Sequence, residues 1–290
     1  MQQSGRSVNL VRELYRQGPS YVFAKKPGEI AEEFGFSQVA RLASNENPFG
    51  PSPFAINEIN KAIDTINRYP DTTQPDLIHA LEKFHGKYSF VTGAGMDGVI
   101  ETCIRAIVNP GDKVAVSTPT FSFYGLATAA QGGTVENVPR NAEFSVDISS
   151  FISSARDAKI SFLCTPNNPS GTVTPVSDIE EILRNINGIL FLDNAYVEFS
   201  AEEYRPLMND YENLIIGRTM SKVFGLAGCR VGYAFVPGWF RQVYEKAATP
   251  FALNNLSAAA ATGALQDQEF LDKTISFVKK WRDIFTREAG

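Results

Sequence analysis

Short apolar runs rich in β-branched residues alternate with longer stretches of helical period along most of this chain. Such runs are typical of buried strands, whereas apolar positions three and four residues apart are typical of helices with one buried face. The alternation predicts an α/β fold with three layers, in which a mostly parallel sheet of seven strands lies between helices. We expect strands at 89–92, 113–117, 133–137, 159–163, 189–193, 214–218 and 230–236. We expect helices at 96–108, 121–131, 147–155 and 175–186.

The pattern becomes helical again after Asn254 and ends in an amphipathic stretch. A helix with so large an apolar stripe needs another surface to pack on. No internal repeat or low-complexity linker divides the chain. The apolar positions of the last helix are Phe270, Ile275, Phe277, Val278, Trp281, Ile284 and Phe285.

The charge of the chain argues against large anionic partners. The net charge is -5, so nothing predicts binding to nucleic acid or to an anionic membrane. Residues 1–17 are polar and lack the apolar run of a signal peptide, which predicts a cytoplasmic location. Small molecules are therefore the expected partners.

Cysteine and histidine are too few and too scattered to predict a disulfide framework or a metal site. Cys103, Cys164 and Cys229 lie far apart, and we expect all three to be buried small hydrophobic residues. His79 and His85 fall in one amphipathic helical stretch, where surface or helix-packing roles are expected. No metal is predicted.

A lysine and an arginine stand out in the segment RTMSKVFGLAGCRVG, residues 218–232. Lys222 lies among hydroxyl and small residues, and Arg230 follows eight positions later. An amine that must react with an aldehyde has to be neutral, which burial and a nearby cation favour, and a guanidinium can hold phosphate oxygens. Pyridoxal phosphate carries both an aldehyde and a phosphate. Taken alone, the two residues are more simply explained as a surface lysine at the beginning of a helix and an arginine on the next strand, because such spacings are common.

A glycine-rich turn, Gly93 to Gly98, follows one predicted strand and opens a predicted helix. It has the form of the dinucleotide fingerprint, but the acidic residue that should hold a ribose is not clearly placed after the next strand. Free N–H groups at the beginning of a helix bind phosphate on any carrier. We therefore expect phosphate here and not a dinucleotide.

Four further residues are candidates for holding a flat heterocycle. Asp193 ends an apolar strand, where α/β sheets place ligands, and a protonated pyridine nitrogen would be a suitable partner; a helix cap is the alternative. Asn168 lies in a turn and could only shape it, or could bond a ring oxygen together with Tyr196. Phe121 could stack on the ring or belong to the core.

Taken together, these segments resemble the fold type I, pyridoxal-phosphate-dependent aminotransferases of class I/II, and specifically their histidinol-phosphate aminotransferase branch. The resemblance runs from about Tyr21 to the helix after Asn254. It implies that Lys222 binds the cofactor covalently and moves the substrate proton, that Asp193 pairs with the pyridinium, and that Asn168 and Tyr196 bond the ring hydroxyl. Its motifs lie at 42–52, 68–71, 93–98, 119–121, 166–171, 193–199 and 218–232.

The same resemblance implies the remaining contacts and the reaction. Phe121 would stack on the ring, and Tyr69 would reach the phosphate from the other subunit of a homodimer. Amino and keto acids would be the substrates: histidinol phosphate and 2-oxoglutarate would give imidazole acetol phosphate and glutamate, in histidine biosynthesis. Tyr21 and Asn45 would lie near the substrate. The implied phosphate ligands are Arg230, Ser221, Thr219 and the backbone of Gly95, Met96 and Asp97.

Some positions depart from the family pattern. Asn194 stands where glutamate is usual, and Phe121 stands where tyrosine is commoner. The pattern also implies residues after Gly290, including the arginine that grips the substrate carboxylate; Arg282 and Arg287 are expected to be solvated helix charges.

The resemblance also implies a domain division. Residues 1–50 would form an N-terminal arm and part of a small domain, 51–265 the large cofactor-binding domain, and 266–290 the truncated beginning of a C-terminal small domain. Two alternatives remain open: a protein that binds pyridoxal phosphate without turnover and uses its last helix for association, or a related decarboxylase of a phosphorylated amino acid.

Overall fold

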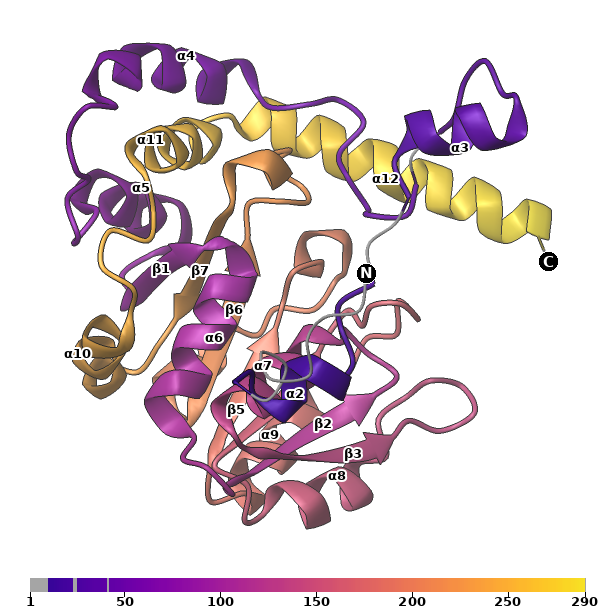
Figure 1. Cartoon of the computed structure of the whole chain (residues 1–290), viewed down its shortest axis with the longest axis vertical. Coiled ribbons are helices and arrows are strands. Elements are labelled where there is room, and N and C mark those ends of the chain that lie inside the picture. Colours follow the sequence, from indigo (N-terminus) through magenta and orange to yellow (C-terminus); the bar gives the residue numbers. More distant parts are fainter. Residues whose placement is uncertain (1–9, 23–24, 41, 290) are drawn as a thin grey trace.

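All seven predicted strands form one sheet in the computed structural model, which describes residues 10–22, 25–40 and 42–289 (Figure 1). The strands lie in the order β1-β7-β6-β5-β4-β2-β3, and only β7 runs antiparallel to its neighbours. The predicted three-layer fold with a mostly parallel sheet is confirmed. The strands are β1 Phe90–Ala94, β2 Lys113–Thr118, β3 Thr134–Pro139, β4 Ile160–Cys164, β5 Ile189–Asp193, β6 Leu214–Thr219 and β7 Val231–Phe235.

Helices cover both faces of the sheet because alternate strand residues point to opposite sides. Phe162 and Phe191 belong to the core on one side, whereas Leu190 and Leu192 belong to the core on the other. The first side is covered by α6 Gly95–Ile107, α7 Phe123–Gln131 and α10 Gly238–Ala247. The second is covered by α5 Pro75–His85, α8 Ile148–Ala155, α9 Val176–Asn185 and α11 Asn255–Ala264.

The remaining elements lie before, between and after these layers. The helix α4 packs on α11. In the described part of the chain, four short 3-10 helices, η1 to η4, occur in the connections, and η2 begins four residues after β5 ends. Their bounds are α2 Glu13–Gln17, α3 Pro27–Phe34, α4 Pro53–Ala62, η1 Ile63–Thr65, η2 Val197–Phe199, η3 Arg205–Asn209, η4 Ala227–Cys229 and α12 Gln268–Ala289.

The last helix, α12, extends beyond the sheet (Figure 1). Its first half packs on the segment before α4, where the rings of Phe49 and Phe277 lie 4.8 Å apart. Further along, Trp281 and Phe285 remain 41% and 67% exposed. The apolar stripe predicted from the sequence is therefore only partly covered.

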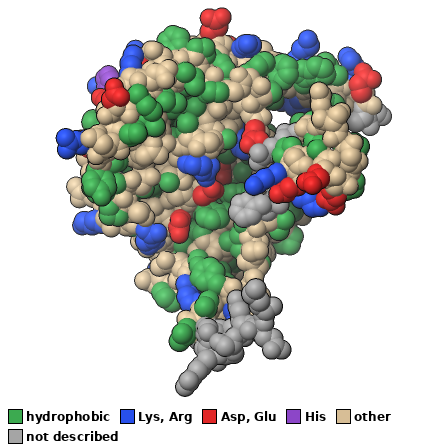
Figure 2. All heavy atoms as spheres, turned by 45° about the horizontal axis from the view of Figure 1, so that its top comes forward, with side chains coloured by type: hydrophobic (Ala, Val, Ile, Leu, Met, Phe, Trp, Pro, Cys, Tyr) green, Lys and Arg blue, Asp and Glu red, His purple; other side chains and the backbone are tan. Residues whose placement is uncertain are grey.

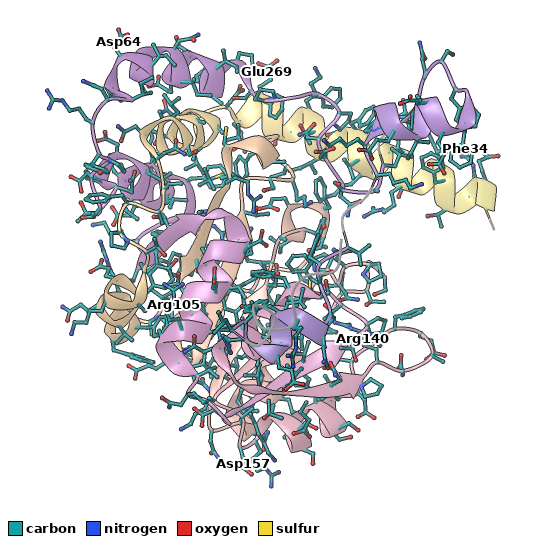
Figure 3. The ribbon with its side chains drawn as sticks, viewed as in Figure 1. Phe34, Asp64, Arg105, Arg140, Asp157 and Glu269 are labelled. Carbon is teal, nitrogen blue, oxygen red and sulfur yellow. The ribbon has the colours of Figure 1, made fainter. Side chains whose placement is uncertain are left out.

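Buried polar residues connect the ends of several elements. Arg140 follows β3 (Figure 3) and donates to the carbonyl oxygens of Phe144 and Cys164, which ties this end of β3 to the end of β4. His85 is buried at the end of α5, where Nε2 lies 2.8 Å from the Tyr233 hydroxyl, so a packing role is confirmed for this histidine. Cys103 and Cys164 are buried as predicted.

The prediction for the third cysteine is wrong. Cys229 is only half-buried because it lies in η4, a turn between Lys222 and Arg230, and not in a strand or a core helix.

Basic and acidic side chains are interspersed over most of the face drawn in Figure 2. None of the described helices is both long and apolar enough to cross a membrane. The polar residues 1–9 lie outside the described part of the chain.

Candidate active site

The candidate residues meet at one edge of the sheet. Asp193 and Thr219 end β5 and β6, Asn168 lies in the loop after β4, and Gly95 follows β1. These strands are parallel, so their carboxyl ends share an edge; β7 runs the other way, which brings Arg230, the residue before it, to the same edge. The carboxyl edge is where open α/β sheets bind ligands.

Asp193 presents a buried carboxylate at this edge. It is 3% exposed; Oδ2 accepts a hydrogen bond from the Tyr124 hydroxyl at 2.5 Å, and Oδ1 accepts one from the Ala195 N–H at 2.9 Å. Burial raises the pKa of the carboxyl group, and the two hydrogen bonds oppose that rise. No described residue forms an ion pair with it. A buried carboxylate held in this way is suited to a cationic partner such as a protonated ring nitrogen.

Tyr124 is a residue of the site that the sequence did not reveal. It is fully buried in α7, and its ring stacks on Phe162 with centroids 4.8 Å apart. Phe121 touches the same ring edge-on at 5.6 Å. The only signal in the sequence is the spacing of three residues between Phe121 and Tyr124, which is also ordinary for core residues of a helix.

The Lys222 amine lies beside Tyr196. Nζ donates to the carbonyl oxygen of Ser44 at 2.8 Å and lies 5.5 Å from the centroid of the Tyr196 ring. Burial lowers the pKa of the amine, while the charges of Glu46 and Asp193 act in the opposite direction. A lowered pKa increases the fraction of neutral amine, which is the nucleophilic form.

The Tyr196 hydroxyl is kept neutral and is held from one side. Burial raises its pKa to about 12, so the phenol retains its proton at neutral pH. Its oxygen accepts a hydrogen bond from Nδ2 of Asn45 at 3.1 Å. Tyr196, Asn45, Asn168 and Lys222 all line one cavity of about 830 Å³.

The far wall of this cavity comes from α12. Thr274, Val278, Lys279 and Arg282 line it. Arg282 is exposed as predicted, at 56% of its side chain, and its Nη1 also donates to the carbonyl oxygen of Phe199 at 3.2 Å. Helix α12 thereby contacts the loop that carries Tyr196.

The beginning of α6 forms a cradle with Arg230. Gly95 has φ +75°, and a Cβ atom there would lie 2.4 Å from Nη2 of Arg230, so only glycine permits this close approach. Arg230 Nη2 also donates to Oδ2 of Asp97 at 2.6 Å, with the two side chains 49% and 41% exposed. Met96 and Asp97 lie in the first helical turn, whose N–H groups have no partner within the helix. A guanidinium beside such a turn can bind a phosphate group.

Two hydroxyl residues shape the turn that presents Lys222. Thr219 and Ser221 are 5% and 8% exposed. The Ser221 N–H donates to Thr219 Oγ1 at 3.1 Å, and the Thr219 hydroxyl donates to Ser221 Oγ at 3.0 Å. They fix the direction in which the chain leaves β6.

The outermost candidates are aromatic. Tyr21, 41% exposed, touches Phe121 edge-on at 6.2 Å and so lies beside the site. Tyr69 is 82% exposed and stacks on Phe251 at 4.6 Å, and no described contact joins it to the other candidates. The described residues contain no group of three or more potential metal ligands.

Known proteins are similar to this chain in sequence and in fold. A model of the aminotransferase class I and II family matches residues 37–289. The chain belongs to the class I and II aminotransferases. This aminotransferase is 57% identical over 280 residues to the histidinol-phosphate aminotransferase of Methanoculleus marisnigri, covering 97% of the chain and 80% of the relative. The histidinol-phosphate aminotransferase of Methanocorpusculum labreanum is 56% identical over 269 residues, covering 92% and 76%.

A solved structure supports the same assignment for this aminotransferase. It is similar to the crystal structure of histidinol-phosphate aminotransferase from Sinorhizobium meliloti in complex with pyridoxal-5'-phosphate. The TM-score is 0.82 at 27% sequence identity, and the match covers 94% of this chain and 74% of the other. The family resemblance and the fold predicted from the sequence are confirmed.

Proposed function

We propose that this aminotransferase uses pyridoxal 5'-phosphate to convert histidinol phosphate and 2-oxoglutarate into imidazole acetol phosphate and glutamate, a step of histidine biosynthesis. The observation that carries the proposal is the 57% identity to a histidinol-phosphate aminotransferase along 97% of the chain. The site supports it, because the amine, the carboxylate and the phosphate cradle lie at one edge of the sheet. The relatives do not favour a decarboxylase or a binder without turnover.

The residues present fit the cofactor. Asp193 offers the ring nitrogen a buried carboxylate that has no ion-pair partner among the described residues. The absence of a side chain at Gly95 leaves room for the Arg230 guanidinium at the beginning of α6, where the phosphate would bind. The remaining contacts in the proposal are stacking by Phe121, bonds to the ring hydroxyl from Asn168 and Tyr196, and phosphate contacts from Thr219, Ser221 and the backbone of Met96 and Asp97. Gly95, predicted as a further backbone ligand, already donates its N–H to the carbonyl oxygen of Arg230 at 2.8 Å.

The chain's own groups then perform the proton movements. When bound, pyridoxal phosphate supplies an aldehyde that accepts the amino group and a ring that withdraws electrons. Burial lowers the pKa of the Lys222 amine, and Nζ would take the proton from the substrate α-carbon and deliver it to the cofactor carbon that carried the aldehyde. Asp193 keeps a negative charge beside the ring nitrogen, and the neutral Tyr196 hydroxyl donates a hydrogen bond. Tyr21 and Asn45 flank the substrate.

The proposal includes a homodimer and a division into domains. Tyr69 and Phe251 form an exposed aromatic pair, suited to contact the phosphate site of a second copy. Residues 51–265 would bind the cofactor, while 1–50 and 266–290 would contribute an arm and a smaller domain. Light scattering tests the assembly: a monomer that binds the cofactor fully would contradict the dimer.

The experiment replaces the amine. The protein is loaded with pyridoxal phosphate, its visible absorbance is recorded, and glutamate is measured after adding histidinol phosphate and 2-oxoglutarate. Lys222→Ala should lose the covalent absorbance band and lower turnover by at least about 10³-fold, because both the covalent link and the proton carrier are gone. Lys279→Ala, which changes another lysine of the same cavity, should keep the band. Failure of the wild type to form glutamate, or an active Lys222→Ala variant, would refute the proposal.

A further inference from the structure

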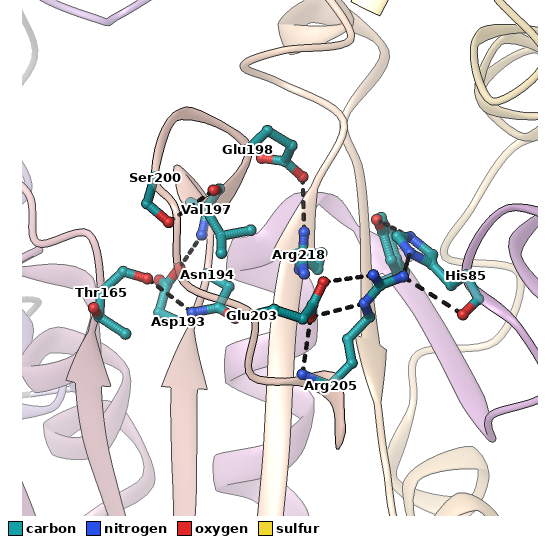
Figure 4. A network of polar contacts seen from close by, with 12 residues as sticks. His85, Thr165, Asp193, Asn194, Val197, Glu198, Ser200, Glu203, Arg205 and Arg218 are labelled. Carbon is teal, nitrogen blue, oxygen red and sulfur yellow. Dashed lines mark hydrogen bonds and ion pairs between the residues drawn. The ribbon is translucent and has the colours of Figure 1, made fainter. Parts of the chain in front are cut away.

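Glu198 and Arg218 form a buried ion pair behind the active site (Figure 4). Nη1 of Arg218 lies 3.0 Å from Oε1 of Glu198, and the two side chains are 6% and 16% exposed. Neither residue lines the cavity that contains Lys222. The pair therefore does not contact a ligand in that cavity directly.

The position of the pair in the chain connects two segments of the site. Glu198 lies in η2, two residues after Tyr196, and Arg218 lies in β6, four residues before Lys222. The Lys222 amine and the Tyr196 ring face each other at 5.5 Å. A link between Glu198 and Arg218 thus fixes the backbone behind Tyr196 relative to the backbone behind Lys222.

Asn45 holds the Tyr196 hydroxyl itself, and other contacts hold the loop at its two ends. At its beginning, the Asn194 N–H donates to the Gly217 carbonyl oxygen at 2.9 Å, which continues the pairing of β5 with β6. At its end, the Phe199 carbonyl oxygen accepts from Arg282, a side chain that is 56% exposed. Glu198 supplies a buried side-chain contact to β6 between these two points.

Stability alone does not account for a buried pair of this kind. Burial raises the pKa of Glu198, and the attraction to Arg218 only opposes that rise. Replacing a buried ion pair by apolar residues of similar size is often neutral or stabilising, whereas removing one partner is strongly destabilising. Unlike an apolar contact, the directional contact between Glu198 and Arg218 fixes the geometry of the Tyr196 loop relative to β6.

Arg218 depends on Glu198 for its charge compensation. Within the described residues, Glu198 is the one carboxylate at ion-pair distance from Arg218. The guanidinium otherwise lies 5.8 Å from the centroid of the Phe235 ring, and its Nε is buried without a hydrogen-bond partner. Neutralising Glu198 would leave the Arg218 guanidinium buried without a counter-charge. Water, or polar groups of the loop that carries Tyr196, would then move toward the guanidinium.

We propose that Glu198 and Arg218 are positioning residues, which hold the Tyr196 hydroxyl at a fixed place relative to the Lys222 amine. They act through Tyr196 and not by touching substrate or cofactor. The inference rests on the function proposed above, because it assigns these residues a part in arranging the same site.

A neighbouring ion pair offers a matched control. Arg205 donates to Oε1 of Glu203 at 2.8 Å and lies 3.1 Å from Nδ1 of His85, in the same region of the molecule (Figure 4). The side chain of Glu203 is 43% exposed. Glu203 and Arg205 both lie further along the chain from Tyr196 than Glu198 does. Glu203→Gln therefore breaks a nearby ion pair without releasing the Tyr196 loop.

The test is a double-mutant cycle with Glu198→Gln and Tyr196→Phe, read out as pyridoxal phosphate affinity and as kcat. Glu198→Gln alone should weaken cofactor binding about 10-fold; in the Tyr196→Phe background most of this loss should disappear, because the hydroxyl that Glu198 positions is already gone. Glu203→Gln should change pyridoxal phosphate affinity and kcat little, and its effects should be additive with those of Tyr196→Phe. Additive effects of Glu198→Gln and Tyr196→Phe would overturn the proposal.

A second readout needs no cofactor. Loosening the Tyr196 loop would admit water to Lys222, and better hydration of the charged amine raises its pKa. Competitive amine labelling of the cofactor-free protein measures that pKa. We expect a higher Lys222 pKa in Glu198→Gln and an unchanged Lys222 pKa in Glu203→Gln. A wild type that does not bind pyridoxal phosphate would refute the proposed function, whereas an unchanged Lys222 pKa in Glu198→Gln would refute only the positioning role.

A third variant covers the case in which Glu198→Gln does not fold. Glu198→Leu combined with Arg218→Met removes both charges and should melt close to the wild type. We expect it to bind pyridoxal phosphate more weakly than the wild type does. Wild-type affinity in this double variant would overturn the proposal.

Discussion

The two ends of the site are built differently. At the ring end, Asp193 and Tyr124 are buried and already hydrogen-bonded to each other. At the phosphate end, Arg230 and Asp97 are about half exposed, and the arginine is paired with an aspartate of its own chain. One end is fixed by packing, and the other is held by a contact open to solvent.

This difference separates stability from binding. An exposed ion pair contributes about 0–1 kcal/mol to folding, so Arg230 can exchange Asp97 for a phosphate group at little cost. A buried carboxylate with a buried tyrosine has no such freedom, because unpairing either group leaves a polar atom without water. Changes at the phosphate end should therefore alter affinity alone. At the ring end, loss of the Asp193 charge should alter the chemistry, and loss of the Tyr124 donor should alter folding.

The largest effect is expected at the ring end, from Asp193→Asn. The amide keeps the acceptor for the Ala195 N–H but removes the charge beside the ring nitrogen. We expect kcat/KM to fall about 10²- to 10³-fold, as for other losses of a preorganised electrostatic partner. Because burial disfavours the Asp193 charge, thermal unfolding of the cofactor-free variant should show no large loss of stability. Near-wild-type activity of Asp193→Asn would contradict the proposed difference between the two ends.

A smaller effect, confined to affinity, is expected from Arg230→Gln. Loss of a charged hydrogen-bond donor to phosphate should raise the Kd for pyridoxal phosphate about 10- to 100-fold. The melting temperature of the cofactor-free protein should not change, since the pair with Asp97 is exposed. Arg105→Gln, which breaks another exposed pair on α6, controls for the loss of a surface charge. A marked drop in melting temperature would show that the phosphate end is also structural.

The smallest effect is expected from Tyr124→Phe, measured as unfolding in urea. The substitution keeps the ring stacking but removes the donor to Asp193, which should cost about 1–2 kcal/mol. Burial raises the folded-state pKa of Asp193, and losing the donor raises it further. The penalty for the charge is fully present above the folded-state pKa and disappears as the pH falls below it. The stability loss of Tyr124→Phe should therefore be larger at neutral pH than at acidic pH.

A second buried tyrosine provides the control for this pH dependence. The Tyr244 hydroxyl donates to the carbonyl oxygen of Thr92 at 3.0 Å, and a carbonyl does not titrate. Tyr244→Phe should therefore lose stability by a similar amount at both pH values. An equal loss for Tyr124→Phe at both would mean that the Tyr124 bond does not depend on the charge of Asp193.

The sequence is sufficient where local patterns decide the structure. The central strands β4, β5 and β6 are buried on both faces, so their residues are mostly apolar, and their predicted bounds agree with the structure to within two residues. Lys222 and Arg230 share one segment, and Asp193 ends a strand, which is why the amino-acid sequence alone outlines much of the site.

Contacts between distant segments cannot be predicted from the sequence in the same way. Tyr124 has the pattern of an ordinary core residue of α7, and its bond to Asp193 depends on how that helix packs on the sheet. Glu198 and Arg218 are 20 positions apart and become partners only because β5 and β6 are neighbours. Arg282 contacts Phe199 only because of the direction in which α12 leaves the sheet.

The reversed strand β7 limits how this enzyme can vary. Because β7 returns beside β6, the short turn of residues 223–229 joins Lys222 to Arg230, the two residues proposed to hold opposite ends of the cofactor. Inserting or deleting a single amino acid in that turn would shift Lys222 against Arg230 and spoil both attachments at once. The side chains of this turn are restricted as well, because Val223, Phe224 and Leu226 are buried and a Cβ atom at Gly225 would clash with the carbonyl oxygen of Gly50.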